Sequence, residues 1–317
     1  MRPRLAGLLF VNLATFVWAT NIVLGRWLGN AIGPVTLAAA RFSIGGLVFA
    51  LWLRGRPPEE RRLRGDGPVL LGMALTGVVL FAPLLYLGLR HTTAVNTALI
   101  NGLGPLITGL LAGLILREPM TRRQVHGALV GLLGVIWLIA GGPRALDSPI
   151  RANPGDLVVL AAVTLWGLYS VLGKRAMGRR SALSASAFSA LLGLPFLFPA
   201  ALWEMQTVPV RWSPALGLGV VYIGLAPTVV GFLCWNEGVR RLGPSGAMVL
   251  YNMLPVYGTL LGAALLGETV GLAHGLGGGL VLLGGLIGTG GDRALRDGIM
   301  ETTRRVRASL SGNSLRD

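Results

Sequence analysis

Cysteine and charged residues are both scarce in this chain of 317 residues. Cys234 is the only cysteine, so the chain can form no intramolecular disulfide and has no cysteine cluster for zinc. Charged residues make up 13%, about half the usual share, while 53% of the residues are hydrophobic and another 48 are glycine. That is too little polar side chain to cover a water-soluble globule of this size. The composition therefore disfavours a soluble enzyme or binding module.

Long apolar stretches take the place of the missing charge. The hydrocarbon core of a bilayer is about 30 Å thick, and a helix needs about 20 apolar residues to cross it. Short polar breaks divide the chain into stretches of about this length. We predict an all-α integral membrane protein with ten transmembrane helices, at 5–25, 34–53, 68–89, 94–116, 124–141, 155–173, 183–203, 214–236, 245–267 and 272–290.

The basic residues indicate how these helices are oriented. Of the 28 Lys and Arg residues, 22 fall in alternate breaks together with the two termini, five fall on the other side, and Arg41 lies inside a predicted helix. By the positive-inside rule, both termini are expected in the cytoplasm of a multi-pass protein of the cell membrane. The net charge of +15 is thereby explained by topology and contact with anionic lipid, so nucleic-acid binding is not expected.

The two halves of the chain resemble each other in sequence. WATNIVLGR at 18–26 matches WGLYSVLGK at 166–174, an offset of 148 residues. Further along, Pro105 and Glu118 match Pro255 and Glu268 at an offset of 150. Each half holds five predicted helices, and this odd number makes the second half enter the membrane from the opposite side. The sequence therefore predicts an inverted-topology repeat, which secondary transporters use for alternating access to a central site.

These residues also carry a family resemblance. WATNIVLGRW, LAAARF and the run from Thr92 to Val135, repeated in the second half from Pro244 to Gly285, resemble EamA-type transporters of the drug/metabolite transporter (DMT) superfamily. The resemblance implies ten helices around a central cavity and the export or exchange of a small metabolite such as an amino acid. We expect a first EamA-like repeat at 1–141, an external linker at 142–154, a second repeat at 155–290 and a disordered cytoplasmic tail at 291–317.

Polar residues within apolar helices are the candidates for a substrate cavity, because such groups are unfavourable in lipid unless they face protein or water. Thr97 and Asn101 share a face of the fourth predicted helix, and Tyr251 with the adjacent Asn252 lies at the corresponding part of the ninth. Pro105 and Pro255 each free a carbonyl one turn earlier, which is expected to produce a helix break or gating point. The alternative is that the prolines only kink these helices and the asparagines only join neighbours.

Five further cavity candidates lie mid-span on the first and sixth helices, and Tyr86 on the third is a sixth. Aromatic residues at this depth commonly pack against neighbouring helices, so a packing role stays open for them. The five residues on the first and sixth helices are Trp18, Asn21, Trp166, Tyr169 and Ser170.

Arg41 lies about 10 Å from the outer end of the second helix and needs a partner or a wet cavity. Its long side chain can extend toward the interface, so a structural or outer-gate role is favoured over anion binding. Its counterpart in the second half is Ser189, so the arginine is not a symmetric feature. The glutamates Glu118 and Glu268, at helix ends, are expected to hold the following helix.

Acidic residues are absent from the middle of every predicted span, which disfavours coupling through a mid-membrane carboxylate. Facilitated export or exchange is the least demanding alternative. No set of residues predicts a catalytic centre, a metal site or a cofactor, so an intramembrane enzyme is disfavoured, and a receptor or scaffold without transport is a further alternative. The expected partners are a small-molecule substrate and membrane lipid. Pairs of glycines four residues apart are expected to pack helix four on five and nine on ten, or to form a homodimer of an otherwise monomeric protein.

Overall fold

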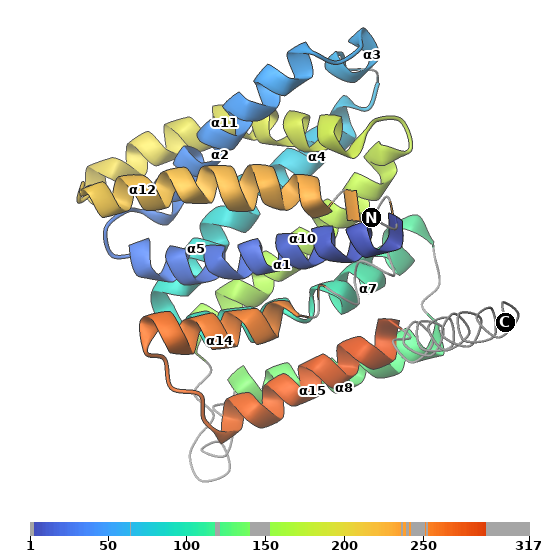
Figure 1. The fold of residues 1–317 in the computed structure, drawn as a ribbon, viewed down its shortest axis with the longest axis vertical. Helices are drawn as coiled ribbons and strands as arrows, with labels where there is room; N and C mark the ends of the chain where they lie inside the picture. Colours follow the sequence, from blue (N-terminus) through green and yellow to red (C-terminus); the bar gives the residue numbers. More distant parts are fainter. Residues whose placement is uncertain are drawn as a thin grey trace, which may run out of the picture.

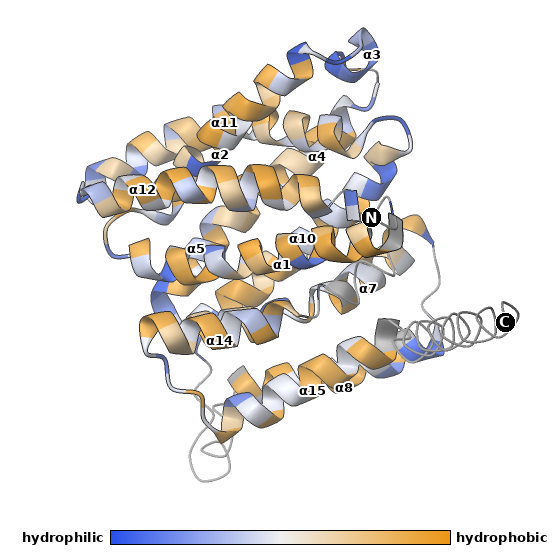
Figure 2. Cartoon of the chain, in the orientation of Figure 1, coloured by the Kyte–Doolittle hydropathy of each residue, from blue (hydrophilic) through white to orange (hydrophobic). Residues whose placement is uncertain are grey.

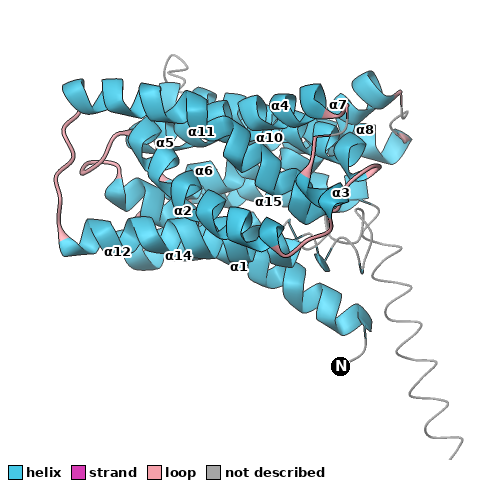
Figure 3. Ribbon diagram, turned by 90° about the horizontal axis from the view of Figure 1, so that it is seen from above, coloured by secondary structure: helices cyan, strands magenta, loops and turns pink. Residues whose placement is uncertain are grey.

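The computed structural model describes residues 3–63, 65–117, 121–139, 153–235, 237–238, 241, 251 and 253–289. Every regular element in these ranges is helical, and the helices pack side by side in one bundle (Figures 1 and 3). The predicted tail at 291–317 lies outside the described residues, as does the predicted linker except for Asn153 and Pro154.

Four long helices run without interruption: α1 (Pro3–Leu28), α2 (Pro34–Arg54), α10 (Pro154–Met177) and α11 (Ala182–Thr207). Two further spans each contain a π-helical segment. The span 67–91 consists of α4 (Gly67–Met73), η1 (Ala74–Leu80) and α5 (Phe81–His91). The span 214–235 consists of α12 (Pro214–Ile223), η2 (Gly224–Val230) and helical residues 231–235. The remaining helices are α3 (Pro58–Arg61), α6 (Ala94–Asn101), α7 (Gly104–Leu116), α8 (Arg122–Ile139), α14 (Leu254–Leu266) and α15 (Leu272–Thr289).

Six spans among the described residues are long and apolar enough to cross a membrane, and the pair α6 and α7, bent by 41°, makes a seventh. Helices α8, α14 and α15 contain shorter apolar segments. Large apolar side chains also cover the outside of the bundle: Leu114 is 77% exposed and Leu218 is 73% exposed. Figure 2 shows hydrophobic colour along most of the helices and hydrophilic colour around α3. The chain is therefore a multi-pass helical membrane protein, since such a surface is stable in lipid rather than in water.

Six of the ten predicted spans coincide with long helices, and the fourth coincides with the bent pair. The fifth, ninth and tenth correspond to α8, α14 and α15, whose described apolar segments are shorter, so ten membrane-spanning helices are not shown. The fourth predicted span differs most, because the chain breaks at Gly102 and Leu103 between α6 and α7. Pro105, the second residue of α7, has no N–H to donate to the carbonyl of Asn101, so a continuous α-helix would lack a hydrogen bond here. In the second half, Pro255 is likewise the second residue of α14.

The two π-helical segments lie at equivalent places in the two halves. η1 covers Ala74–Leu80 and η2 covers Gly224–Val230, so the two segments have equal length and an offset of 150 residues. This is the offset found between the prolines of the two halves. A π-helical turn inserts one extra residue per turn and commonly marks a functional segment of a helix.

Helix α15 packs antiparallel on α8, low in Figure 1, through glycines that bring the two backbones close together. A Cβ built on Gly134 would lie 2.5 Å from the carbonyl oxygen of Gly277, and one built on Gly284 would lie 2.5 Å from that of Gly127. Only glycine fits such contacts. The glycine pattern therefore predicted close packing, but its main partners are the fifth and tenth predicted helices rather than the fourth with the fifth and the ninth with the tenth.

Carboxylates at both ends of the α2 and α11 pair cap the neighbouring helix. At one end, Glu204 accepts hydrogen bonds from the backbone N–H groups of Val35 and Thr36 and from the Thr36 hydroxyl, at 3.2, 2.7 and 2.7 Å. At the opposite end, Glu60 accepts from the backbone N–H and the hydroxyl of Ser181. Each carboxylate satisfies donors at the start of a helix that have no partner within the helix itself.

Glu268 also caps a helix of the other half. Its carboxylate accepts from the backbone N–H groups of Ala94 and Val95 at 2.8 and 2.9 Å, at the start of α6. The expectation that Glu268 holds the following helix, α15, is therefore wrong, because the free N–H groups at the start of α6 lie within reach of the carboxylate. Glu118 lies outside the described residues.

Candidate functional site

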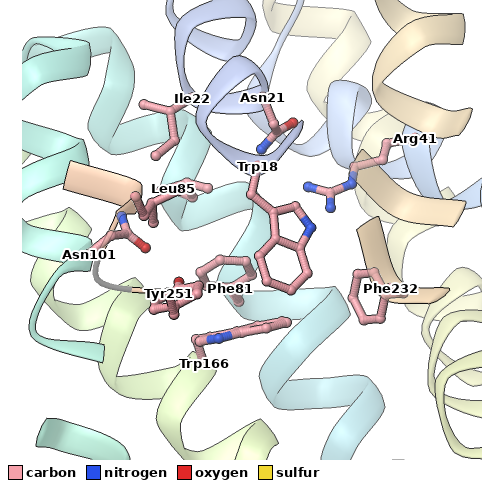
Figure 4. A pocket seen from close by; sticks show the side chains of 11 residues that line it. Trp18, Asn21, Ile22, Arg41, Phe81, Leu85, Asn101, Trp166, Phe232 and Tyr251 are labelled. Carbon is pink, nitrogen blue, oxygen red and sulfur yellow. The ribbon is translucent and has the colours of Figure 1, made fainter. Parts of the chain in front are cut away.

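A small cavity lies inside the bundle, between side chains from both halves of the chain. It has a volume of about 40 Å³, enough for a few water molecules rather than a metabolite. Figure 4 shows its side chains converging from α1, α2, α5 and α6 of the first half, and from α10 and residues after 231 of the second half. It is lined by Trp18, Asn21, Ile22, Arg41, Phe81, Leu85, Asn101, Trp166, Phe232, Tyr251 and Leu254.

Trp18 lies at the centre of an aromatic cluster. Its ring centroid is 6.0 Å from those of Trp166, Phe232 and Tyr251, in edge-to-face arrangements that aromatic pairs favour. Its indole N–H donates to the carbonyl of Pro227 at 2.9 Å, which fixes the ring relative to η2. Much of the cavity wall is therefore rigid and aromatic, able to pack against an apolar or planar part of a ligand.

Arg41 brings a positive charge to this otherwise neutral cavity. The side chain is only 4% exposed, and its Nε donates to the hydroxyl of Thr228 at 2.7 Å. One terminal nitrogen donates to the hydroxyl of Tyr86 at 3.2 Å, and Tyr86 in turn donates to Oδ1 of Asn21 at 2.9 Å. Among the described residues, no carboxylate forms an ion pair with Arg41.

Asn101 lines the cavity at the end of α6, beside the break that precedes α7. Its side-chain amide donates to the carbonyl of Thr97 at 2.9 Å, one turn earlier in the same helix. No donor to the side-chain oxygen of Asn101 is present among the described residues, and Pro105 cannot donate to the main-chain carbonyl of Asn101. Figure 4 shows Asn101 and Arg41 on opposite sides of Trp18. The cavity thus has acceptors on one side and a cation on the other.

The structure brings six of the predicted site residues to one cavity: Trp18, Asn21, Arg41, Asn101, Trp166 and Tyr251.

Four other predicted residues lie behind this wall. Tyr86 is 2% exposed and joins Arg41 to Asn21, as described above, and Tyr169 stacks on Trp166 with ring centroids 4.8 Å apart. The hydroxyls of Thr97 and Ser170 donate to carbonyls one turn earlier in their own helices, at 2.8 Å each.

The predicted prolines lie at the helix breaks, and Pro255 is buried. Asn252 and the side chain of Pro105 lie outside the described residues.

The prediction missed the apolar part of the lining. Polar residues in lipid attract notice in a sequence, whereas an apolar residue in an apolar helix carries no signal of which way it faces. Phe81, which follows directly after η1, packs on Trp166 with ring centroids 5.0 Å apart, a contact that only the structure reveals. The missed residues are Ile22, Phe81, Leu85, Phe232 and Leu254.

Comparison with known proteins gives this arrangement a context. The sequence pattern described as the EamA-like transporter family matches residues 5–140 and again residues 153–288. The chain belongs to the EamA-like transporter family. The predicted resemblance to EamA-type transporters of the DMT superfamily is confirmed, and each match to the family covers one half of the chain.

Curated EamA relatives align over most of their length. The chain is 28% identical to "Uncharacterized transporter YyaM" of Bacillus subtilis (strain 168), over 89% of this chain and 93% of the relative. It is 27% identical to "Probable terminal-alkyne amino-acid exporter" of Streptantibioticus cattleyicolor, with the same coverage. It is also 27% identical to "Aromatic amino acid exporter YddG" of Ancylobacter novellus, over 78% of this chain and 84% of the relative.

The EamA fold is also found among solved structures. A crystal structure of a protein aligns with 92% of this chain and 99% of its own, at 25% sequence identity and a TM-score of 0.63. The described helices therefore follow an arrangement that an experimental structure also has.

Proposed function

We propose that this EamA protein is a secondary transporter that exports a small metabolite, an amino acid or a related compound, by alternating access. The observation that carries the proposal is the buried cavity to which both EamA units contribute, with Trp18 from one and Trp166 from the other. Two relatives with exporter names, both referring to amino acids, support this substrate class. An aromatic wall, a cation and the acceptor oxygens of Asn101 suit a small molecule with an apolar body and polar ends.

In this proposal the transport path lies between two five-helix units, 1–141 and 155–290, that form an inverted repeat. The protein lies in the cell membrane with both termini on the cytoplasmic side. Several features support this arrangement. The π-helical segments repeat at an offset of 150 residues, and the capping carboxylates Glu60 and Glu204 lie at opposite ends of the α2 and α11 pair. Such a repeat allows one set of helix contacts to open outward and the equivalent set to open inward.

A cavity of about 40 Å³ is too small for an amino acid, which supports assigning the described conformation to a closed state of the proposed cycle. Contacts between the halves support this interpretation at both ends. At the start of α6, Thr92 and Asn96 donate to Asp156 of α10, and Glu268 caps the same helix. At the other end, Arg180 donates to Asp66. Opening on either side requires one of these sets of contacts to separate while the other holds, which gives alternating access.

Counterflow in proteoliposomes tests the transport proposal. Purified protein is reconstituted with an unlabelled amino acid inside, and uptake of the labelled compound is followed for each of the twenty amino acids. We expect accumulation of at least one, and its loss in Asn101→Ala and Tyr251→Ala variants that elute as folded protein. The outer-end variant Arg26→Met, which alters no lining residue, is the matched control. Binding without any crossing would contradict the proposal and favour a receptor.

The orientation has a separate test. A reporter that is active only in the cytoplasm is fused to the C-terminus, and we expect it to be active. A signal from the opposite side would contradict both the topology and the inverted repeat.

A further inference from the structure

Arg41 is the one feature of the cavity that a general transport role leaves unexplained. Its side chain is 96% buried, yet among the described residues its only hydrogen-bond partners are the hydroxyls of Thr228 and Tyr86. A guanidinium has five N–H groups, and these two bonds use two of them. A buried charge without a counter-ion is unfavourable and is rarely retained without a role.

We propose that Arg41 is the anion anchor of the cavity and binds the carboxylate of the transported substrate. The inference rests on the transport function proposed above and deepens it, because it assigns a charge to one end of the substrate. Figure 4 shows the guanidinium directed into the cavity toward Trp18. A planar fork of N–H groups matches the two oxygens of a carboxylate, and the missing counter-ion is then supplied by the substrate.

The two hydroxyls hold the guanidinium in place without neutralising it. Thr228 accepts from Arg41 while donating to the carbonyl of Ile223 at 3.0 Å, and Tyr86 accepts from Arg41 while donating to Asn21. Both hydroxyl protons are thus already in use, so each hydroxyl presents an oxygen to Arg41. This arrangement aims the remaining N–H groups. The Phe42 ring, 5.1 Å from the guanidinium carbon, attracts the cation without neutralising it, so the net positive charge remains for a ligand.

The surroundings favour a carboxylate over a phosphate. Arg41 is the only basic residue that lines the cavity in the described part of the chain, so a monoanion is neutralised and a dianion is not. Across the cavity, the oxygen atoms of Asn101 can accept from the N–H groups of an ammonium, with aromatic rings between the two ends. A zwitterion with an apolar side chain complements this distribution of charge.

A purely structural role fits less well, because the equivalent position in the second half needs no cation. Ser189 occupies that position in α11, is 2% exposed, and donates to the carbonyl of Ser186 at 2.9 Å. Helix α11 therefore packs in the bundle with a small neutral residue where α2 has arginine. Among the described lining residues, the cation is therefore present on one side of the cavity only. A substrate with a single anionic end needs a cation on one side only.

Paired ligands that differ only in the carboxylate test the anchor. The probes are L-phenylalanine and L-phenylalaninamide, followed by leucine, isoleucine and valine with their amides. Binding is measured by quenching of tryptophan fluorescence, since Trp18 and Trp166 line the cavity, and crossing is measured by counterflow. We expect the wild type to bind at least one acid about tenfold or more tightly than its amide, the range of a hydrogen-bonded ion pair.

Arg41→Met removes the charge while roughly keeping the length of the side chain, and we expect it to reduce the preference for the acid to less than about threefold. Arg41→Gln is a second neutral variant, and Arg26→Met is the matched control, because Arg26 binds the carbonyls of Leu89 and Arg90 outside the cavity. The control is expected to keep the full preference.

Each other result overturns a defined part of the proposal. Equal binding of acids and amides by the wild type, or an unchanged preference in Arg41→Met, overturns the anchor and leaves a transporter that passes counterflow intact. If neither neutral variant folds, Arg41 is a structural residue and the anchor is wrong. If the wild type neither binds nor transports any compound of the panel, both the anchor and the amino-acid function are overturned.

Discussion

Arg41 and Arg180 are two buried arginines with opposite surroundings. Arg180, before α11, donates from Nε and a terminal nitrogen to Asp66 and also contacts the hydroxyl of Ser184 at 3.2 Å. Arg41, inside α2, donates only to hydroxyls among the residues that the structure describes, and its guanidinium lies 5.1 Å from the centre of the Phe42 ring. The first arginine is complete within the fold and joins the two halves at one end. Under the anchor proposed above, a ligand carboxylate completes the second, which would distinguish a structural charge from a binding charge.

The largest loss of stability is expected when Arg180 loses its carboxylate partner. Asp66→Asn leaves the Arg180 charge buried without its partner, and removing one member of such a pair costs about 3–5 kcal/mol. Arg41→Met, in contrast, removes a charge that has no carboxylate partner among the described residues, so the stability of the variant is expected to stay equal or rise. Unfolding in mixed micelles without ligand measures both. A larger loss in Arg41→Met than in Asp66→Asn would contradict the distinction between the two arginines.

A smaller effect is expected from two equivalent glycines of the repeat. A Cβ on Gly25 would lie 2.8 Å from ring atoms of Tyr86, the residue that orients Arg41. A Cβ on Gly173 would lie 3.4 Å from the flexible end of Met73. Gly25→Ala should therefore destabilise the protein by about 1–3 kcal/mol through overpacking.

Gly173→Ala is its matched control and is expected to be neutral, because alanine is the better helix former and the methionine can move. The same unfolding measurement compares the two, and equal effects would mean that the ring of Tyr86 is free to move.

The smallest expected effect is the difference in stability between replacing Trp18 and replacing the equivalent Trp166. Trp18→Phe keeps an aromatic ring but leaves the carbonyl of Pro227 without its donor, at an expected cost of about 1 kcal/mol beyond that of Trp166→Phe. No hydrogen bond from the indole of Trp166 is present among the described residues, so its replacement by Phe changes packing alone. The difference between their unfolding free energies measures the Pro227 bond, and a difference near zero would show that this bond contributes nothing.

Much of the helical pattern could be predicted from the sequence, because an apolar stretch of about 20 residues has few alternatives to a membrane helix. The break between α6 and α7 was also predictable in kind, since Pro105 cannot donate a backbone bond. The π-helical form of η1 was not, because nothing local marks it: it depends on how the span packs against α10 and α11. Likewise, the contact of α8 with α15 depends on which glycine faces meet in three dimensions.

The candidate site shows the same division. The sequence by itself determined that the chain is a repeated EamA membrane protein and that a few polar and aromatic residues lie deep in its helices, since composition, periodicity and matching positions are properties of the chain alone. Only the tertiary structure decided that Trp18, Asn101 and Arg41 share one cavity and that no carboxylate of the described residues pairs with Arg41. The rotation of each helix decides which side chains face the cavity, and the spacing between helices decides which groups lie within reach of Arg41. Both arise from packing between segments far apart in sequence.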